Sequence, residues 1–217
     1  MPHRRTVVLA TRNPGKLREI REILGELPVR VIGLEETPRL PEPSEGGATF
    51  AENARQKALY YARATGHWCL ADDSGLAVDA LGGAPGVRSS RYAAERWPPD
   101  AARETIDAAN NAKLLAELKD VPEGMRSARF ICHLALADGQ RVLIETSGAV
   151  EGCIAREGRG CNGFGYDPLF YIPQLGCTSA ELPPEQKNRI SHRGQAARRF
   201  AILLKDMLAR QDGPAED

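Results

Sequence analysis

The sequence predicts an α/β protein built around a mixed β-sheet, and three observations lead to this fold class. Residues 6–10 form a continuous apolar run rich in β-branched side chains, as in strands buried on both faces. A short polar loop follows, and apolar side chains then recur at helical spacing over residues 17–24. Two later strand-like runs, 129–136 and 142–146, are separated by an Asp-Gly dipeptide, which signals a hairpin. Because parallel units dominate the first half of the chain, we expect this hairpin at the edge of the sheet.

The same patterns predict the other elements. Residues 29–32 are expected to be a second strand, whereas residues 34–48, rich in Pro, Glu and Gly, are expected to be a loop. Residues 49–52 have the spacing of a capping box and open a helix. Two more helices are predicted, one over residues 100–118 and one after Ser191, which is placed to act as an N-cap.

Length and composition are those of an ordinary globular protein. The 217 residues suit one large domain or two lobes, and 42% hydrophobic with 27% charged residues argues against global disorder. Lys plus Arg and Asp plus Glu both number 29, and a formal net charge of zero argues against non-specific binding of nucleic acid. We expect one domain over residues 1–210 and a disordered tail over 211–217.

The sequence indicates neither a membrane segment nor a disulfide framework. No run of about 18 apolar residues occurs, and the N-terminus lacks the apolar region of a signal peptide, so a cytoplasmic protein is expected. The five cysteines are odd in number and include no Cys-x-x-Cys pair, so free thiols are expected rather than disulfides or a zinc site.

Asp72 and Asp73 form the centre of the predicted site. An apolar, strand-like run over residues 68–71 ends in these two carboxylates, and Ser74 and a glycine follow. Adjacent anionic side chains repel each other unless a cation lies beside them, and a divalent metal ion is a natural partner. On local grounds the alternative is a turn whose two acids are solvated.

Residues 11–16 connect the first strand to the first helix. The backbone N–H groups of such a loop and the helix N-terminus suit an anion, and Lys16 adds a full positive charge. The loop is not a Walker P-loop, because Ala10 stands where that pattern needs a glycine and Leu17 stands where it needs Ser or Thr. The alternative is an ordinary strand-to-helix turn without a ligand.

A glycine-rich stretch over residues 158–165 ends at two aromatic side chains, Phe164 and Tyr166. Glycines that flank aromatic residues suit a loop where the backbone approaches a flat ligand and a ring stacks on it. The alternative is that the rings anchor the loop in a hydrophobic core.

Six segments in this order resemble the inosine triphosphate pyrophosphatase family, the XTP/dITP diphosphatases. The resemblance covers nearly the whole chain, from Val7 to about Phe200. The segments are TRNPGK at 11–16, TFAENARQKA at 49–58, ADDSGLAVDAL at 71–81, GAPGVRSSRY at 83–92, GFGYDP at 163–168 and ISHRGQA at 190–196.

The resemblance implies hydrolysis of ITP, dITP and XTP to the monophosphate and pyrophosphate, which removes deaminated purines from the nucleotide pool. It also implies Mg²⁺ as the cofactor, a homodimer, and a long twisted mixed sheet with flanking helices and two lobes around a central substrate cleft. The physical demands of this reaction agree with the residues above. Attack on the α-phosphate needs an activated water, a metal ion that neutralises the triphosphate, and cations that take up the charge shifting to pyrophosphate.

The resemblance further implies a role for each polar residue. Asp73 is the general base and a metal ligand, Glu45 is the second metal carboxylate, and Asp72 is a supporting acid. Lys16 and Lys57 are expected to hold the phosphates, together with the amides of residues 11–15. The substrate contacts so assigned are Thr11, Arg12, Asn13, Pro14, Gly15, Lys16, Ser74, Phe164, Gly165, Tyr166, Asp167, Lys187, His192 and Arg193.

Base selection is assigned to residues 164–167 together with His192 and Arg193. A 6-oxo purine presents an acceptor where adenine presents an amino donor, so Arg193, which can only donate, favours the oxo base.

One departure from the family pattern lies beside Glu45. Family members often have Glu-Thr-Gly where this chain has Glu45-Gly46-Gly47, and we expect the extra glycine to loosen the loop. Two other functions stay open at the level of sequence: a nucleotide-binding protein with weak or no catalysis, and a pyrophosphatase acting on pyrimidine nucleotides.

Overall fold

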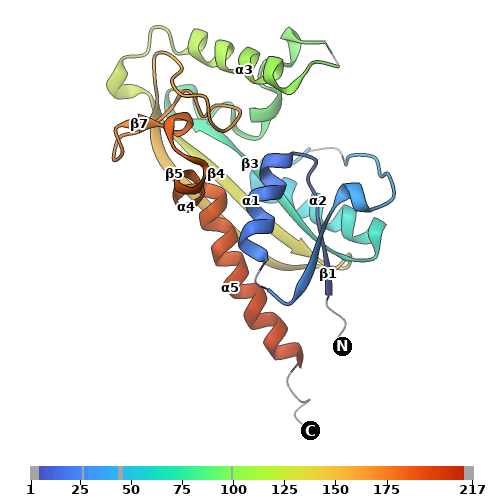
Figure 1. Cartoon of the computed structure of the whole chain (residues 1–217). Helices are drawn as coiled ribbons and strands as arrows, with labels where there is room; N and C mark the ends of the chain where they lie inside the picture. The colour runs from blue at the N-terminus through green and yellow to red at the C-terminus, as the bar shows by residue number, and fades with distance from the viewer. Residues whose placement is uncertain (1–4, 26, 44–45, 99, 213–217) are drawn as a thin grey trace. The chain divides into compact units, whose positions relative to one another are not determined.

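A seven-stranded sheet forms the framework of the chain in the computed structural model, which describes residues 5–25, 27–43, 46–98 and 100–212 (Figure 1). The strand order is β2-β1-β3-β4-β5-β6-β7. The strands are β1 (Arg5–Leu9), β2 (Val29–Gly33), β3 (Trp68–Val78), β4 (Ser127–Ala137), β5 (Val142–Ile154), β6 (Phe170–Ile172) and β7 (Cys177–Thr178).

The sheet is mixed, as predicted. β1 pairs in parallel with β2 and β3, whereas β6 pairs antiparallel with β5 and β7. The predicted edge position of the β4–β5 hairpin is wrong, because β6 and β7 extend the sheet beyond β5 and leave the hairpin inside it. These two added strands have three and two residues, too few for a hydrophobic pattern to reveal them.

The helices predicted from the sequence are present in the described chain. They are α1 (Pro14–Leu24), α2 (Phe50–Thr65), α3 (Arg103–Glu117) and α5 (His192–Asp212), and the short α4 (Pro184–Ile190) precedes α5. Because α5 reaches Asp212, the first two residues of the predicted disordered tail are helical instead. Residues 213–217 lie outside the described residues. In the ranges that the structure describes, no helix has both the length and the apolar character of a membrane span.

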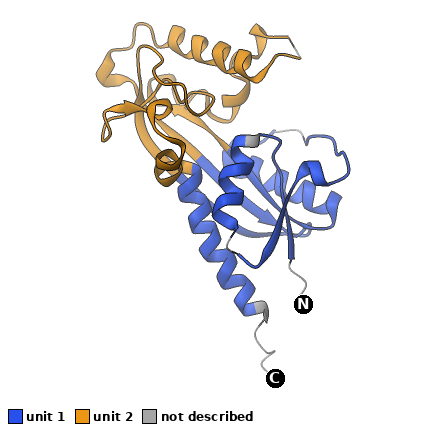
Figure 2. Ribbon diagram, viewed as in Figure 1, with its two compact units in different colours: residues 1–73, 132–148, 193–217 blue, residues 74–131, 149–192 orange. Residues whose placement is uncertain are grey.

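The chain divides into two compact units (Figure 2). Unit 1 combines residues 1–73, 132–148 and 193–217, and unit 2 combines residues 74–131 and 149–192. Three unit boundaries fall within β3, β4 and β5, so these strands contribute residues to both units, and the fourth falls after His192, the first residue of α5.

In unit 1, different helices cover the two faces of the sheet. Leu70 of β3 packs in an apolar core with side chains of α1 and α5, whereas its neighbour Ala71 packs in a second core with side chains of α2. Successive side chains of a strand point to opposite faces. Asp72 therefore belongs to the face covered by α1 and α5, and Asp73 belongs to the face covered by α2.

Asp72 and Asp73 lie inside β3, which corrects the prediction that the strand ends at them. β3 is an 11-residue strand that continues to Val78. Its parallel partner β1 already ends at Leu9, which pairs with Leu70, and the loop that follows β1 leads into α1. The two acids are therefore in a strand interior but beyond the carboxyl end of the neighbouring strand, where ligands bind in many α/β proteins.

Unit 2 has its own core. Leu76 and Val78 of β3, Leu114 of α3, Phe130 of β4 and Phe170 of β6 are buried together in it. This core supports the loop of residues 155–169, which carries residues 164–167 of those assigned to the base, and the helix α4, which carries Lys187.

Candidate functional site

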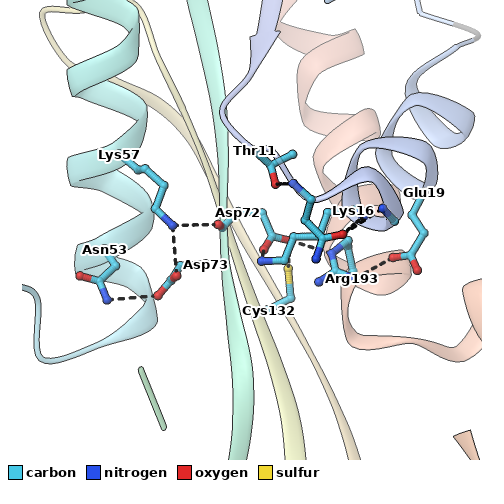
Figure 3. Close-up of polar contacts among 11 residues, drawn as sticks. Thr11, Lys16, Glu19, Asn53, Lys57, Asp72, Asp73, Cys132 and Arg193 are labelled. Carbon is cyan, nitrogen blue, oxygen red and sulfur yellow. Dashed lines mark hydrogen bonds and ion pairs between the residues drawn. The ribbon is translucent and has the colours of Figure 1, made fainter. Parts of the chain in front are cut away.

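Asp72 is buried in a network of ion pairs on the α1 and α5 face of β3 (Figure 3). Lys16 Nζ, at the start of α1, donates to Asp72 Oδ1. Arg193 Nε, at the start of α5, donates to Asp72 Oδ2 over 2.8 Å, and Arg193 Nη1 donates to Glu19 Oε2 over 2.7 Å. Two carboxylates thus face two cations, and this charge balance offsets the cost of burying them.

The charges of this network are fixed by their neighbours. Burial alone would raise the pKa of Asp72, but the Coulombic attraction of Arg193 and Lys16 holds the pKa of Asp72 well below its usual value. Burial likewise acts to lower the pKa of Arg193, but Asp72 and Glu19 raise this pKa above its usual value. Cys132 Sγ lies 3.3 Å from Asp72 Oδ2, and burial and the Asp72 charge raise the pKa of the thiol well above its usual value. Asp72 is therefore an anion, and Cys132 is a neutral donor to it.

Asp73 points to the opposite face, where α2 supplies its partners (Figure 3). Lys57 Nζ lies 3.3 Å from Asp73 Oδ1 and 3.4 Å from the backbone oxygen of Asp72. Asn53 Nδ2 donates to Asp73 Oδ2 over 3.2 Å. Both partners come from α2, four residues apart, so one face of this helix presents the amide and the ammonium to the same carboxylate.

Asn53 connects Asp73 to the loop before α2. Its Oδ1 accepts a hydrogen bond from Gly47 N over 2.9 Å, which fixes the orientation of the amide and directs Nδ2 toward Asp73. A Cβ at Gly47 would lie 2.7 Å from Asn53 Oδ1, whereas a Cβ at Gly46 would meet nothing within 4 Å. Gly47 is therefore needed for close approach, and Gly46, the residue that departs from the family pattern, is not. Glu45, the predicted second metal carboxylate, lies outside the described residues.

The loop of residues 11–16 satisfies its own backbone donors. Thr11 N donates to Leu9 O, Asn13 N donates to Thr11 Oγ1, and Asn13 Oδ1 accepts from the N–H groups of Gly15 and Lys16. Asn13 is thus the N-cap of α1. These amides are predicted to bind phosphate, but the hydrogen bonds that they already make within the loop would have to break first. The charged Lys16 side chain is therefore a better candidate than the amides for contact with a phosphate.

A small recess in unit 2 brings together two of the residues assigned to the base, Asp167 and His192, with Lys187. Asp167 and Lys187 line it, and Lys187 Nζ lies 2.6 Å from Asp167 Oδ2. His192 also lines it, and its ring stacks on Phe130 with the ring centroids 4.9 Å apart and the planes 12° apart. Lys187 Nζ additionally lies 4.9 Å from the centre of the Phe164 ring. The recess therefore combines flat faces with one donor and one acceptor.

Tyr166 anchors its loop instead of offering a face for stacking. Its side chain is buried in the core of unit 2, and its hydroxyl donates to Ser89 O over 2.9 Å. Burial raises the pKa of this hydroxyl, so it stays a neutral donor. The alternative of a hydrophobic anchor, left open by the sequence, thus holds for Tyr166, whereas the Phe164 ring is partly exposed.

The remaining residues that were predicted to contact the substrate do not lie together in one place. Arg12 pairs with Glu42 over 3.0 Å on the surface of unit 1, and Ser74 follows Asp73 in β3 and is partly exposed. Arg193 is engaged by Asp72 and Glu19, so its assignment to the purine base stays a prediction.

Sequence reasoning missed three members of the networks around the two acids. Glu19 is three residues from Lys16 on the same helix face, a spacing that could have been noticed. Asn53 was noted beside Lys57 without a role. Cys132 gave no signal, because its contact with Asp72 joins residues 60 positions apart.

These observations define an α/β protein with buried acid–cation clusters suited to an anionic ligand. The model of the Ham1 family matches residues 7–202, and the chain therefore belongs to the Ham1 family. This match confirms the family resemblance drawn from the six sequence motifs.

Individual relatives agree with this placement. A dITP/XTP pyrophosphatase of Geobacter sulfurreducens is 50% identical over 205 residues, covering 94% of this chain and 97% of that protein. A dITP/XTP pyrophosphatase of Pseudomonas aeruginosa is 52% identical over 206 residues, covering 93% of this chain and 96% of that protein. The solved structure of a HAM1 protein from Coxiella burnetii has a TM-score of 0.82 and 44% identity, covering 93% of this chain and 99% of that chain.

Proposed function

We propose that this chain hydrolyses the purine nucleoside triphosphates ITP, dITP and XTP to the monophosphate and pyrophosphate. The observation that carries the proposal is Asp73, a carboxylate held between an amide and a lysine, next to an acid whose charge two other cations already balance. The names of relatives that are about 50% identical over nearly the whole chain support the same activity.

The chemistry follows from the positions of the charges. A water molecule attacks the α-phosphorus, the new P–O bond forms as the bond to the bridging oxygen of the β-phosphate breaks, and pyrophosphate leaves. Asp73 accepts the proton of the attacking water. Lys57 and Lys16 stabilise the negative charge that moves to the leaving pyrophosphate. Asp72 supports the site because it holds Lys16 at the start of α1.

The carboxylates of the proposed site fit Mg²⁺ when this ion is bound together with the substrate phosphates. In the described ranges, no three His, Cys, Asp or Glu side chains are grouped to hold a metal ion by themselves. Mg²⁺ is commonly held by one or two carboxylates together with substrate phosphates and waters, so Asp73, with Glu45 as the second carboxylate, is sufficient. When bound, the ion would neutralise the triphosphate and lower the pKa of the attacking water.

The side chains around the recess in unit 2, and not the narrow recess itself, support recognition of a purine. Phe164 and the stacked pair of His192 and Phe130 offer flat surfaces, and Lys187 offers a donor to the 6-oxo group. Adenine presents a donor at that position and would leave two donors facing each other, which selects against ATP.

A substrate panel tests the proposal. With Mg²⁺ present, the purified protein should release pyrophosphate from ITP, dITP and XTP, and much less from GTP, ATP and dUTP. Release of orthophosphate instead would contradict the mechanism. A preference for dUTP would identify a pyrimidine pyrophosphatase, and tight binding of ITP without turnover would identify a binding protein.

The homodimer and the cytoplasmic location are also proposals. Light scattering of the purified protein measures the mass directly and should give twice the 23.6 kDa of one chain. A mass of one chain would contradict the dimer.

A further inference from the structure

Two side chains of α3 hold one glycine of the 164–167 turn in unit 2. Gly165 N donates to Asp107 Oδ2 over 2.8 Å, and Asn111 Nδ2 donates to Gly165 O over 3.0 Å. Asp107 and Asn111 are four residues apart and lie on one face of α3. Both backbone polar groups of a single residue are therefore fixed by one helix.

We call the two hydrogen bonds from Asp107 and Asn111 to Gly165 the clamp, and they hold Gly165 in an unusual backbone conformation. Its φ of +64° is in the left-handed region, which residues other than glycine rarely adopt. A Cβ built on Gly165 meets nothing within 4 Å, so packing does not require a glycine at this position. The backbone conformation requires it, and the two α3 side chains are the contacts that hold that conformation.

The clamped turn carries Asp167, one of the polar residues that line the base recess. On one side of Gly165, Phe164 N donates to Asp167 Oδ2 over 2.7 Å, and the same oxygen accepts from Lys187 Nζ. On the other side, Tyr166 is fixed to Ser89 O. A shift of Gly165 would thus move the Phe164 ring and the carboxylate that orients Lys187.

The clamp has an energetic cost that packing alone does not explain. Asn111 Oδ1 is buried and has no hydrogen-bond partner among the described residues, so the amide uses its donor on Gly165 and leaves its acceptor unsatisfied. A buried, unsatisfied polar atom destabilises the folded state. An amide that is retained at this cost is better explained by a task than by stability.

We propose that Asp107 and Asn111 are positioning residues that set base selectivity, because they fix Gly165 and with it Phe164 and Asp167. The class of ligand concerned is the base of a 6-oxo purine nucleotide. This inference rests on the proposed function, since it concerns the same recess.

The test compares the variants Asn111→Ala, Asp107→Ala and Asp107→Asn with the wild type. Glu104→Gln is the matched control, because Glu104 is an exposed residue of the same helix. Each protein is assayed for pyrophosphate release from ITP, from ATP and from ribose 5-triphosphate, which has no base. In parallel, calorimetry measures the affinity for IMP and AMP, and thermal unfolding confirms that each variant is folded.

Asn111→Ala should raise KM for ITP about 10-fold and reduce the preference for ITP over ATP, because a misplaced Lys187 donor costs the 6-oxo base a contact that adenine does not make. Its kcat/KM for ribose 5-triphosphate should stay within about 2-fold of the wild type, since that substrate does not use the recess. Asp107→Asn keeps an acceptor for Gly165 N and should lose less selectivity than Asp107→Ala. Glu104→Gln should behave as wild type.

The outcomes separate this inference from the proposed function. An unchanged preference for ITP in Asn111→Ala, or an equal loss with all three substrates, would overturn the positioning role. A wild-type protein that neither releases pyrophosphate from ITP nor prefers IMP to AMP would overturn the proposed function, and with it this inference, before any variant is compared.

Discussion

Asp72 and Asp73 are neighbours in β3, yet their surroundings differ in kind. Asp72 meets Lys16 and Arg193, and the pKa of Asp72 is held far below its usual value. Asp73 meets an amide and a lysine of α2 at distances of 3.2 and 3.3 Å, beside a loop. The strand alternation that separates them thus gives the two acids separate partner sets, two cations for Asp72 and an amide and a lysine for Asp73.

The difference shows how a pair of adjacent carboxylates is accommodated in a strand interior. Each face of the sheet supplies its own cations, so the two negative charges are neutralised independently. Variants at the two positions should therefore fail in different ways.

Replacing Asp73 should have the largest effect, and it should be on turnover. Asp73→Asn keeps the size of the side chain but cannot accept the proton of water at neutral pH, so kcat for ITP should fall by about 10²–10⁴-fold. Steady-state kinetics measure this, with circular dichroism as the check on folding. Turnover within a few fold of the wild type would contradict the role of Asp73 as the base.

Replacing Asp72 should chiefly reduce stability. Asp72→Asn leaves the buried Arg193 and Lys16 with one carboxylate, Glu19, between them, and breaking a buried ion pair costs about 3–5 kcal/mol. Urea unfolding measures the change in the free energy of unfolding. If Asp72→Asn were as stable as the wild type, the network would not have the structural role that its burial indicates.

The structural role of Asp72 should also appear in how the free energy of unfolding depends on pH. Because the folded-state pKa of Asp72 is lowered, its contribution is fully present above its unfolded pKa, about 3.9, and is lost as pH falls toward the folded-state value. The stability difference between wild type and Asp72→Asn should therefore shrink as pH falls below about 4. Urea unfolding of the metal-free proteins at several pH values measures it. A difference that grows in acid would contradict the assigned direction.

The smallest effects concern the loop beside Asp73. Gly47→Ala should disturb Asn53 and lower kcat several fold, because the new Cβ would lie 2.7 Å from Asn53 Oδ1 and 2.8 Å from Glu52 Cβ. Gly46→Ala is the matched control and should change little, since a Cβ there has open space. Equal effects of the two changes on ITP turnover would show that the Gly47–Asn53 contact does not orient Asp73.

Much of unit 1 followed from local pattern. The buried run of β1, the helical spacing of α1 and the Thr49 cap of α2 are properties of short segments, and each is present as predicted. The length of β3 was misjudged because two adjacent acids look like the end of a strand when their cations are far away in the sequence.

The sequence by itself determined the α/β class, the family and the set of charged residues, since these depend on periodicity and on ordered motifs. Only the tertiary structure decided which acid each cation meets. Arg193 reaches Asp72 across 121 residues because α5 covers one face of β3, and Lys57 reaches Asp73 because α2 covers the other. Alternation along a strand places neighbouring side chains on opposite faces, but the course of the whole chain decides which helix lies on each face.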